Sequence, residues 1–134
     1  MNREILFRAK RIGDGKWFEG YYCGGTEDKT INPCIFEYLG GMKGYDYHNI
    51  ILDTLGQYTG MKDKNGRRIF EGDIILPHGY KPEACPVFYE DFCFQIDSNI
   101  CVLCVADEDD IEVIGNIYDK PDLLEVSDKN ADSN

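Results

Sequence analysis

Apolar and polar residues alternate over several short segments of this 134-residue chain. In residues 4–12 the alternation is imperfect: Ile5, Phe7 and Ala9 fall on one side of an extended chain, and Arg8 and Lys10 on the other. This period of two is typical of a half-buried strand. Gly13-Asp14-Gly15 is a tight-turn sequence, because both residue types accept positive φ. An aromatic-rich segment follows at 16–23. The pattern therefore predicts a β-hairpin over residues 4–23.

The alternation weakens between residues 24 and 49. Two segments rich in glycine and polar residues enclose a short apolar piece, CIFEYL, at 34–39. Such composition predicts a long irregular connection. Loops of this length often carry function, and here only the length and three tyrosines, Tyr38, Tyr45 and Tyr47, point that way.

Short apolar segments return from residue 50 onward. We expect a strand near 50–55. Further along, Asn65-Gly66 is a strong signal for a hairpin with a type I′ turn, which needs positive φ at both positions. A return strand at 68–70, a turn at Glu71-Gly72-Asp73 and a buried strand at 74–76 complete this region. Proline ends the last strand, because it cannot continue the ladder of hydrogen bonds.

The C-terminal third contains three more apolar segments, at 87–96, 100–106 and 111–118. The segment 100–106 is apolar on both faces, which predicts a central strand or one covered by a partner subunit. No long amphipathic helix is present. The chain is therefore predicted to be mainly β, a small barrel-like or sandwich domain with few or no helices. We expect an N-terminal hairpin arm at 1–23, an irregular connection at 24–49, the barrel-like domain at 50–126, and a flexible tail at 127–134.

Composition and charge restrict the class of partner. Hydrophobic residues make up 43% of the chain, enough for a real core, and the charged N-terminus lacks the apolar stretch of a secretion signal. With no apolar run long enough to span a membrane, we expect a cytoplasmic protein. The net charge is −11, and residues 81–134 hold three lysines against fourteen carboxylates. Such acidity disfavours nucleic acid as a partner, unless the N-terminal strands act alone through their basic residues, Arg3, Arg8, Lys10 and Arg11.

Six cysteines raise the question of zinc. Four of them follow a C-x7-C-x7-C-x2-C spacing: Cys85, Cys93, Cys101 and Cys104. The last two lie in an apolar run that is predicted to be a strand, where residues three apart point to opposite faces, so both thiols cannot reach one ion. In a reducing cytoplasm we expect all six, Cys23 and Cys34 included, to be free thiols that mostly pack in the core.

No motif for catalysis or cofactor binding stands out. The two histidines, His48 and His78, are predicted at loop edges, and no nucleophile accompanies them in a known pattern. The acidic run 107–110 lacks the glycine and the alternate spacing of a calcium loop. The glycines of 56–72 match neither phosphate-binding pattern. We therefore predict no catalytic residue, no cofactor and no metal, and we assign the glycines to turns.

Three segments, in this order, resemble the YopX family of small proteins encoded by bacteriophages and prophages. They are ILFRAK…GKWFEGYY near the N-terminus, GQYTGMKDKNGRRIFEGDII in the centre, and IEVIGNIYDKPDLLE near the end. The resemblance implies a bacterial host cell, self-association and no established activity. Its central motif supplies the candidate binding surface, whose alternative role is hydrogen bonding to the backbone of the turns: Gly56, Gln57, Tyr58, Thr59, Gly60, Asp63, Asn65, Gly66, Glu71, Gly72 and Asp73.

Two functions follow as hypotheses. The leading one is a non-catalytic accessory module that associates with itself or binds a host or phage protein. The alternative is an enzyme or small-ligand binder with a pocket between the 24–49 loop and the glycine-rich turns. Its polar lining would come from His48, Tyr58, Asp73 and His78.

Overall fold

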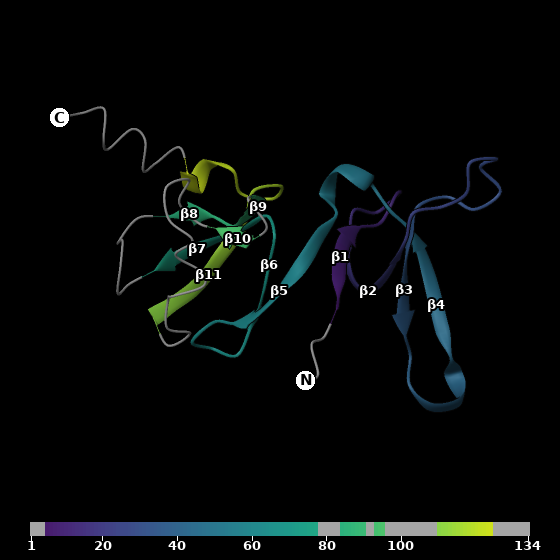
Figure 1. The fold of residues 1–134 in the computed structure, drawn as a ribbon, viewed down its shortest axis with the longest axis horizontal. Coiled ribbons are helices and arrows are strands. Elements are labelled where there is room, and N and C mark those ends of the chain that lie inside the picture. Colours follow the sequence, from purple (N-terminus) through teal and green to yellow (C-terminus); the bar gives the residue numbers. More distant parts are fainter. Residues whose placement is uncertain (1–4, 78–83, 91–92, 96–109, 125–134) are drawn as a thin grey trace. The chain divides into compact units, whose positions relative to one another are not determined.

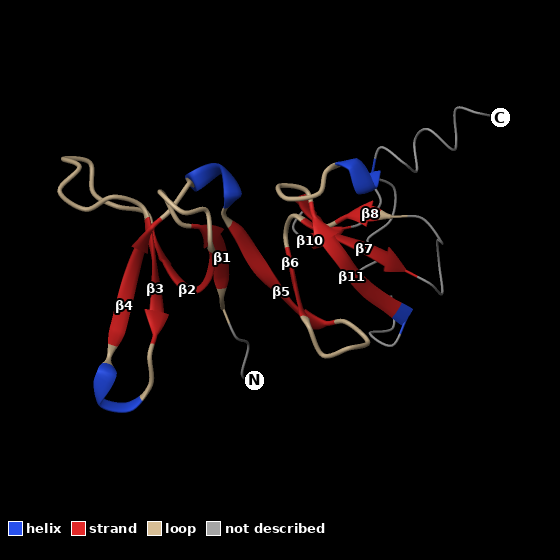
Figure 2. Ribbon diagram, turned by 180° about the vertical axis from the view of Figure 1, so that it is seen from behind, coloured by secondary structure: helices blue, strands red, loops and turns tan. Residues whose placement is uncertain are grey.

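The structure, a computed structural model, describes residues 5–77, 84–90, 93–95 and 110–124 (Figure 1). Strands dominate and helical segments are short (Figure 2), which confirms the mainly-β prediction. The chain forms two compact units, Met1–Tyr58 and Thr59–Asn134.

The first unit is an antiparallel sheet with strand order β4-β3-β2-β1-β5. Its elements are β1 (Phe7–Lys10), β2 (Trp17–Cys23), β3 (Cys34–Tyr38), the 3-10 helix η1 (Gly41–Lys43), β4 (Tyr45–Asn49), the 3-10 helix η2 (Leu52–Thr54) and the beginning of β5 (Gly56–Lys62). The predicted N-terminal hairpin is confirmed: Phe7 lies opposite Gly20, and Lys10 opposite Trp17. Both glycines of its turn have positive φ, at 104° and 68°.

The hairpin is not a separate arm, and most of the connection that follows it is not irregular. β2 pairs with β1 through residues 17–20 and with β3 through residues 21–23. β3 and β4 form a hairpin of their own inside the range 24–49, so the predicted irregular connection is wrong for residues 34–49. These strands alternate aromatic with charged side chains, a weaker signal than the alternation of aliphatic with polar ones. The strand expected near 50–55 is also wrong, because Ile50 makes a single bridge to Arg11 and residues 52–54 form η2.

One side of this sheet carries the first core. Ala9, Ile35 and Ile50 are buried there, and Phe7, Phe18, Tyr22 and Leu55 pack around them. Ile35 and Tyr22 lie directly opposite each other on β3 and β2, so their side chains share this face. The side chains on the opposite face of the same strands are therefore directed away from the core.

The second unit contains the rest of β5 and the shorter strands. These are β6 (Arg68–Phe70), β7 (Asp73–Pro77), β8 (Cys85–Pro86), β9 (Phe88–Glu90), β10 (Cys93–Gln95) and β11 (Ile111–Asn116). β6 follows β5 in the larger sheet, β11-β7-β8 form a second sheet, and β10-β9 form a third. The strands predicted at 68–70 and 74–76 are confirmed, and the one predicted at 111–118 is confirmed over residues 111–116. The segments 100–106 and 127–134 lie outside the described residues.

The second core has a single apolar cluster. It contains Ile69, Ile75, Cys85, Val87, Phe94, Ile111 and Val113, with Met61 packed against it. Cys85 thus occupies the apolar role expected of it. Every sheet in the described ranges has two end strands, so the barrel prediction is not confirmed. No helix in these ranges is long and apolar enough to cross a membrane.

Candidate functional site

The central motif folds as two successive turns between strands. Residues 56–60 lie on β5, 63–66 in the β5–β6 turn, 71–72 in the β6–β7 turn, and Asp73 begins β7. Gly60, Gly66 and Gly72 have φ values of 89°, 80° and 88°, which other residues adopt only with strain. The assignment to turns is confirmed for Gly66 and Gly72, whereas Gly56 and Gly60 lie within β5. The type I′ geometry is wrong, because Lys29 is the one non-glycine residue with positive φ in the described part of the chain, so Asn65 has none.

Asp63 organises the first turn. Its Oδ1 accepts hydrogen bonds from the backbone N–H groups of Asn65 and Arg67, both at 2.9 Å, and its Oδ2 accepts one from Val113 on β11 at 3.0 Å. Burial raises the pKa of this carboxyl group, but the three N–H donors and the charge of Arg67 lower it by more, so the pKa lies below its usual value. Asp63 therefore holds the turn and ties it to a strand fifty residues further along.

Asp73 has a similar role in the second turn. It is fully buried, and its Oδ2 accepts the N–H of Phe70 at 2.7 Å. Gly72 donates its N–H to the carbonyl of Val87, and the Gly72 carbonyl accepts the N–H of Ile117. The two carboxylates of the motif are thus directed at backbone donors inside the protein.

The other motif residues have mixed surroundings. Thr59 donates its hydroxyl to the Ile69 carbonyl at 2.8 Å and accepts the N–H of Met61. Tyr58 is buried. Exposed positions are Gly60, Asn65 and Gly66, whereas Gln57 and Glu71 are partly buried and Gly56 is buried. Residues 56–58 belong to the first unit and the remainder to the second. Asp63, Asp73 and Thr59 therefore form hydrogen bonds to the backbone of the turns. This is the alternative that the sequence offered to a binding surface.

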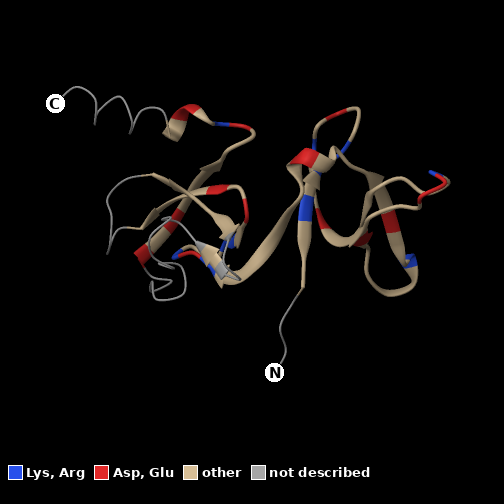
Figure 3. Cartoon of the chain, turned by 45° about the horizontal axis from the view of Figure 1, so that its top comes forward, with Lys and Arg blue, Asp and Glu red and all other residues tan. Residues whose placement is uncertain are grey.

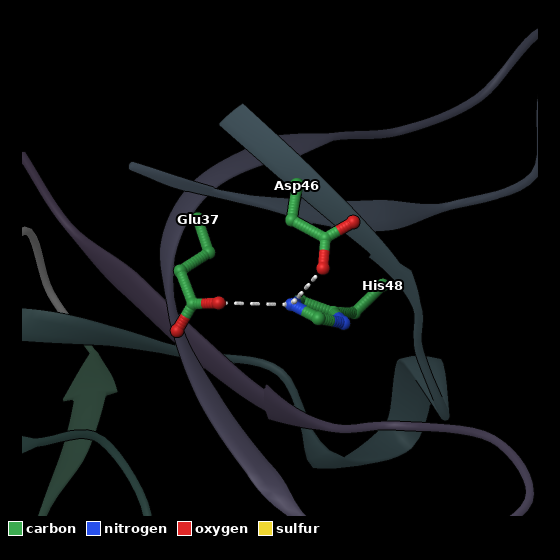
Figure 4. Close-up of side chains that lie close together, drawn as sticks. All are labelled: Glu37, Asp46 and His48. Atoms are coloured by element: carbon green, nitrogen blue, oxygen red, sulfur yellow. Dashed lines mark hydrogen bonds and ion pairs between the residues drawn. The ribbon is translucent and has the colours of Figure 1, made fainter. Parts of the chain in front are cut away.

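A second cluster lies on the core side of the β3–β4 hairpin (Figure 4). His48, whose side chain is 4% exposed, directs Nε2 at Glu37 Oε1, 3.2 Å away, and at Asp46 Oδ2, 3.9 Å away. Glu37 and Asp46 are cross-strand partners, a pairing of like charges that is unfavourable by itself. On its other edge, His48 Nδ1 lies 3.2 Å from Arg11 Nη1. The ring of Phe18 stacks on the imidazole at 3.7 Å between centroids.

The Arg11 contact determines which nitrogen of His48 carries the proton. A guanidinium group only donates hydrogen bonds, so Nδ1 must accept, and in the neutral ring Nε2 carries the hydrogen and donates to Glu37. Arg11 is itself anchored by Asp14, whose carboxylate raises the pKa of Arg11, while Arg11 lowers the pKa of Asp14 to about 2. The guanidinium also provides a positive charge beside the two carboxylates.

This arrangement has a consequence for metal binding. Glu37, Asp46 and His48 offer ligand atoms within 4.8 Å of one another, a set that could surround a cation. A histidine that binds a metal through Nε2 normally donates its Nδ1–H to an acceptor, but here Nδ1 faces a donor. The cluster is therefore better suited to a satisfied polar network than to a metal ion.

The tautomer can be measured directly. We expect the ring nitrogens of neutral His48 to give the ¹⁵N shifts of the Nε2–H form. Replacing Arg11 with methionine removes the donor to Nδ1 and should allow the other tautomer to appear. A wild-type spectrum of the Nδ1–H form would contradict the contact between Arg11 and His48.

A depression of about 490 Å³ opens beside this cluster. It is lined by Arg11, Ile12, Asn32, Asp46, Tyr47, His48 and Asn49. Of the four residues predicted to line a pocket, His48 is present, Tyr58 and Asp73 are not among the lining residues, and His78 lies outside the described residues. The depression is built from the first unit alone, so it does not test the predicted pocket between the 24–49 loop and the glycine-rich turns.

The outer face of β2, β3 and β4 carries a set of exposed aromatic rings, which we call the tyrosine face. It consists of Tyr21, Phe36, Tyr38, Tyr45 and Tyr47, which are 36–63% exposed. Tyr21 lies opposite Phe36, Phe36 opposite Tyr47, and Tyr38 opposite Tyr45, so all five share one side of the sheet. The rings of Tyr38 and Tyr45 are 5.2 Å apart, and those of Tyr21 and Tyr45 are 6.2 Å apart.

Formal charge is absent from the β3 and β4 positions on this side. Each of the two strands has one acidic residue and no lysine or arginine (Figure 3). Those acidic residues are Glu37 and Asp46, which project with His48 from the core side. Sequence reasoning noticed three of the tyrosines but missed the face, because it assigned them to a loop. The alternation of aromatic and polar residues in YDYHN, and in Phe36-Glu37-Tyr38, was the available signal.

Known proteins resemble this chain in sequence and fold. The family model described as YopX protein matches residues 6–125. The chain belongs to the YopX family. A structural relative of this YopX chain is the crystal structure of protein EF1440 from Enterococcus faecalis, with a TM-score of 0.58 and 25% sequence identity over 92% of this chain and 99% of that one. Among curated proteins, none matches.

Proposed function

We propose that this YopX chain is a non-catalytic accessory module of a phage or prophage that associates with copies of itself through the tyrosine face. The observation that carries the proposal is the set of five exposed aromatic rings on one side of β2–β4. On that side, β3 and β4 contribute no formal charge. Tyrosine is enriched at protein interfaces, because its ring provides apolar contact area and its hydroxyl group tolerates water.

The charge of the chain restricts where a second copy can bind. The net charge is −11, so two copies repel each other over most approaches. On the tyrosine face, β3 and β4 carry no formal charge, so two copies can meet there without burying like charges from these strands. β4 is also the end strand of the larger sheet, and an end strand can pair with an identical strand of another copy.

Replacing two rings at the centre of the tyrosine face tests this proposal. We expect the double variant Phe36→Ser, Tyr47→Ser to weaken self-association at least tenfold, because two buried aromatic anchors are removed. Sedimentation or light scattering over a dilution series gives the association constant. Tyr89→Ser is the control, since Tyr89 is 51% exposed but lies in the second unit. A wild-type chain that stays monomeric at high concentration, or a double variant that associates normally, would overturn the proposal.

A small polar ligand in the depression beside His48 is a second candidate function. The polar lining, with Arg11, Asn32 and Asn49 among its residues, favours it. A compound that raises the unfolding temperature of the wild type but not of the Asn32→Ala variant would support this function. The double variant on the tyrosine face should bind such a compound normally.

A further inference from the structure

Cys23 and Cys34 are direct partners across two neighbouring strands. The register of β2 and β3 places them opposite each other, so both thiols project from the same side of the sheet. Both are free in this structure. Burial raises the pKa of the Cys34 thiol, and the neighbouring Cys23 thiol, which shares a hydrogen bond with it, raises it further.

The backbone spacing at this pair suits a disulfide. Two hydrogen bonds to the β4 side flank β3: Ile50 donates its N–H to the Pro33 carbonyl, and Leu39 donates its N–H to the Gly44 carbonyl. Backbone groups of successive strand residues point to opposite neighbours, so the odd-numbered residues of β3 direct their N–H and C=O groups at β4. Cys34 therefore directs its own at β2, and it forms with Cys23 a hydrogen-bonded pair. Such pairs have Cα atoms about 5.5 Å apart, which lies within the range that disulfides span. The Cβ atoms of a hydrogen-bonded pair are about 5.5 Å apart, so closing the disulfide draws them about 1 Å closer.

The two thiols differ in access. Cys34 is 2% exposed, whereas Cys23 is partly exposed. An oxidant from solvent can reach Cys23 first. Cys34 is then in place, directly across the ladder, to complete the reaction.

We propose that Cys23 and Cys34 form a reversible oxidation site that reacts with low-molecular-weight disulfides such as glutathione disulfide. The Cys23 thiolate attacks one sulfur of the oxidant and releases one thiol, which leaves a mixed disulfide on Cys23. Cys34 then loses its proton and attacks the Cys23 sulfur, and the second thiol leaves. Two protein thiols are oxidised and one small disulfide is reduced to two thiols, so atoms and electrons balance.

The crosslink would act on the sheet that carries the tyrosine face. Cys23 and Cys34 project on the same side as Tyr21 and Phe36, and the bond would close the ten-residue loop 24–33. It would fix β2 to β3 at one end of that face.

Tryptic peptides make the crosslink easy to identify. Cleavage after Lys16, Lys29 and Lys43 puts Cys23 in residues 17–29 and Cys34 in residues 30–43, while the other four cysteines fall together in residues 69–129. In a glutathione redox buffer we expect the full chain to lose two hydrogen atoms, and peptides 17–29 and 30–43 to be joined. Trp17, the one tryptophan of the chain, lies on β2. Its fluorescence should report an unfolding temperature roughly 5 °C higher after oxidation, reversed by reductant.

Variants separate the two steps. Cys34→Ala should stop at a mixed disulfide on Cys23, and Cys23→Ser should abolish the reaction of the first unit. Cys85→Ala is the matched control, since Cys85 is a buried cysteine of the second unit, and it should react normally. Failure of peptides 17–29 and 30–43 to join in the wild type, or their joining to 69–129 instead, would overturn the proposal without any variant.

Discussion

Replacing Asp63 with alanine is expected to lower the free energy of unfolding by about 4 kcal/mol. The variant removes one buried carboxylate and leaves three backbone N–H groups without their acceptor: those of Asn65, Arg67 and Val113. Hydrogen bonds to charged groups are worth more than neutral ones, and an unsatisfied buried donor adds a penalty. Denaturant unfolding of the full chain, compared with wild type, measures the loss.

The variant Asp63→Asn is a sharper probe than the alanine variant. It keeps a carbonyl oxygen that can accept from Asn65 and Arg67, but its amide group faces the Val113 N–H with another donor. We expect it to lose about half as much stability as the alanine variant. Equal stability of wild type and Asp63→Ala would show that Asp63 does not connect the turn to β11.

Asp63 also makes stability depend on pH. Its pKa is lower in the folded chain than in the unfolded one, so the unfolded state binds the proton more readily. The carboxylate therefore contributes its full stabilisation above the unfolded pKa of about 3.9, and the contribution is lost as pH falls through the folded pKa. Below about pH 4, the stability of Asp63→Asn should fall less steeply than that of wild type.

The turns were the most predictable part of this fold. Gly13, Gly15, Gly66 and Gly72 follow from local rules alone, since a reversal of the chain within two or three residues needs positive φ and glycine supplies it without strain. Asn65 was assigned the wrong backbone conformation for a non-local reason. The carboxylate of Asp63 binds two N–H groups of the turn, and this favours a turn in which Gly66 has positive φ and Asn65 does not.

Contacts between distant segments were beyond sequence reasoning. Nothing in the motif indicates that Asp63 bonds to Val113, or that Gly72 bonds to Val87. The same limit applies to the histidine cluster, where Arg11, which follows β1, contacts His48 on β4. The tyrosine face differs, because its alternation was present in the sequence. Classification of 24–49 as a loop, from its glycines, obscured that alternation.

Replacing Gly20 with alanine is the other change expected to have a large effect. Gly20 is the residue of β2 at which pairing passes from β1 to β3, since it lies opposite Phe7 and its neighbour Tyr21 lies opposite Phe36. An added Cβ would be 2.1 Å from the Phe36 carbonyl oxygen and 2.8 Å from its carbon. Both atoms belong to the backbone, so no side chain can rotate away. β2 and β3 must separate, and we expect a loss of about 3 kcal/mol or more in the free energy of unfolding.

Gly24→Ala provides the matched comparison. Gly24 follows the same strand, its φ is not positive, and an added Cβ would meet only the Tyr22 side chain, whose hydroxyl oxygen lies 3.4 Å away. It should change stability by less than about 1 kcal/mol. Trp17 fluorescence during denaturant unfolding reports on β2 in both variants. If Gly20→Ala unfolds at the wild-type denaturant concentration, the close approach of β2 to Phe36 is absent in solution. The pairing that places Cys23 opposite Cys34, and Tyr21 opposite Phe36, would then be lost with it.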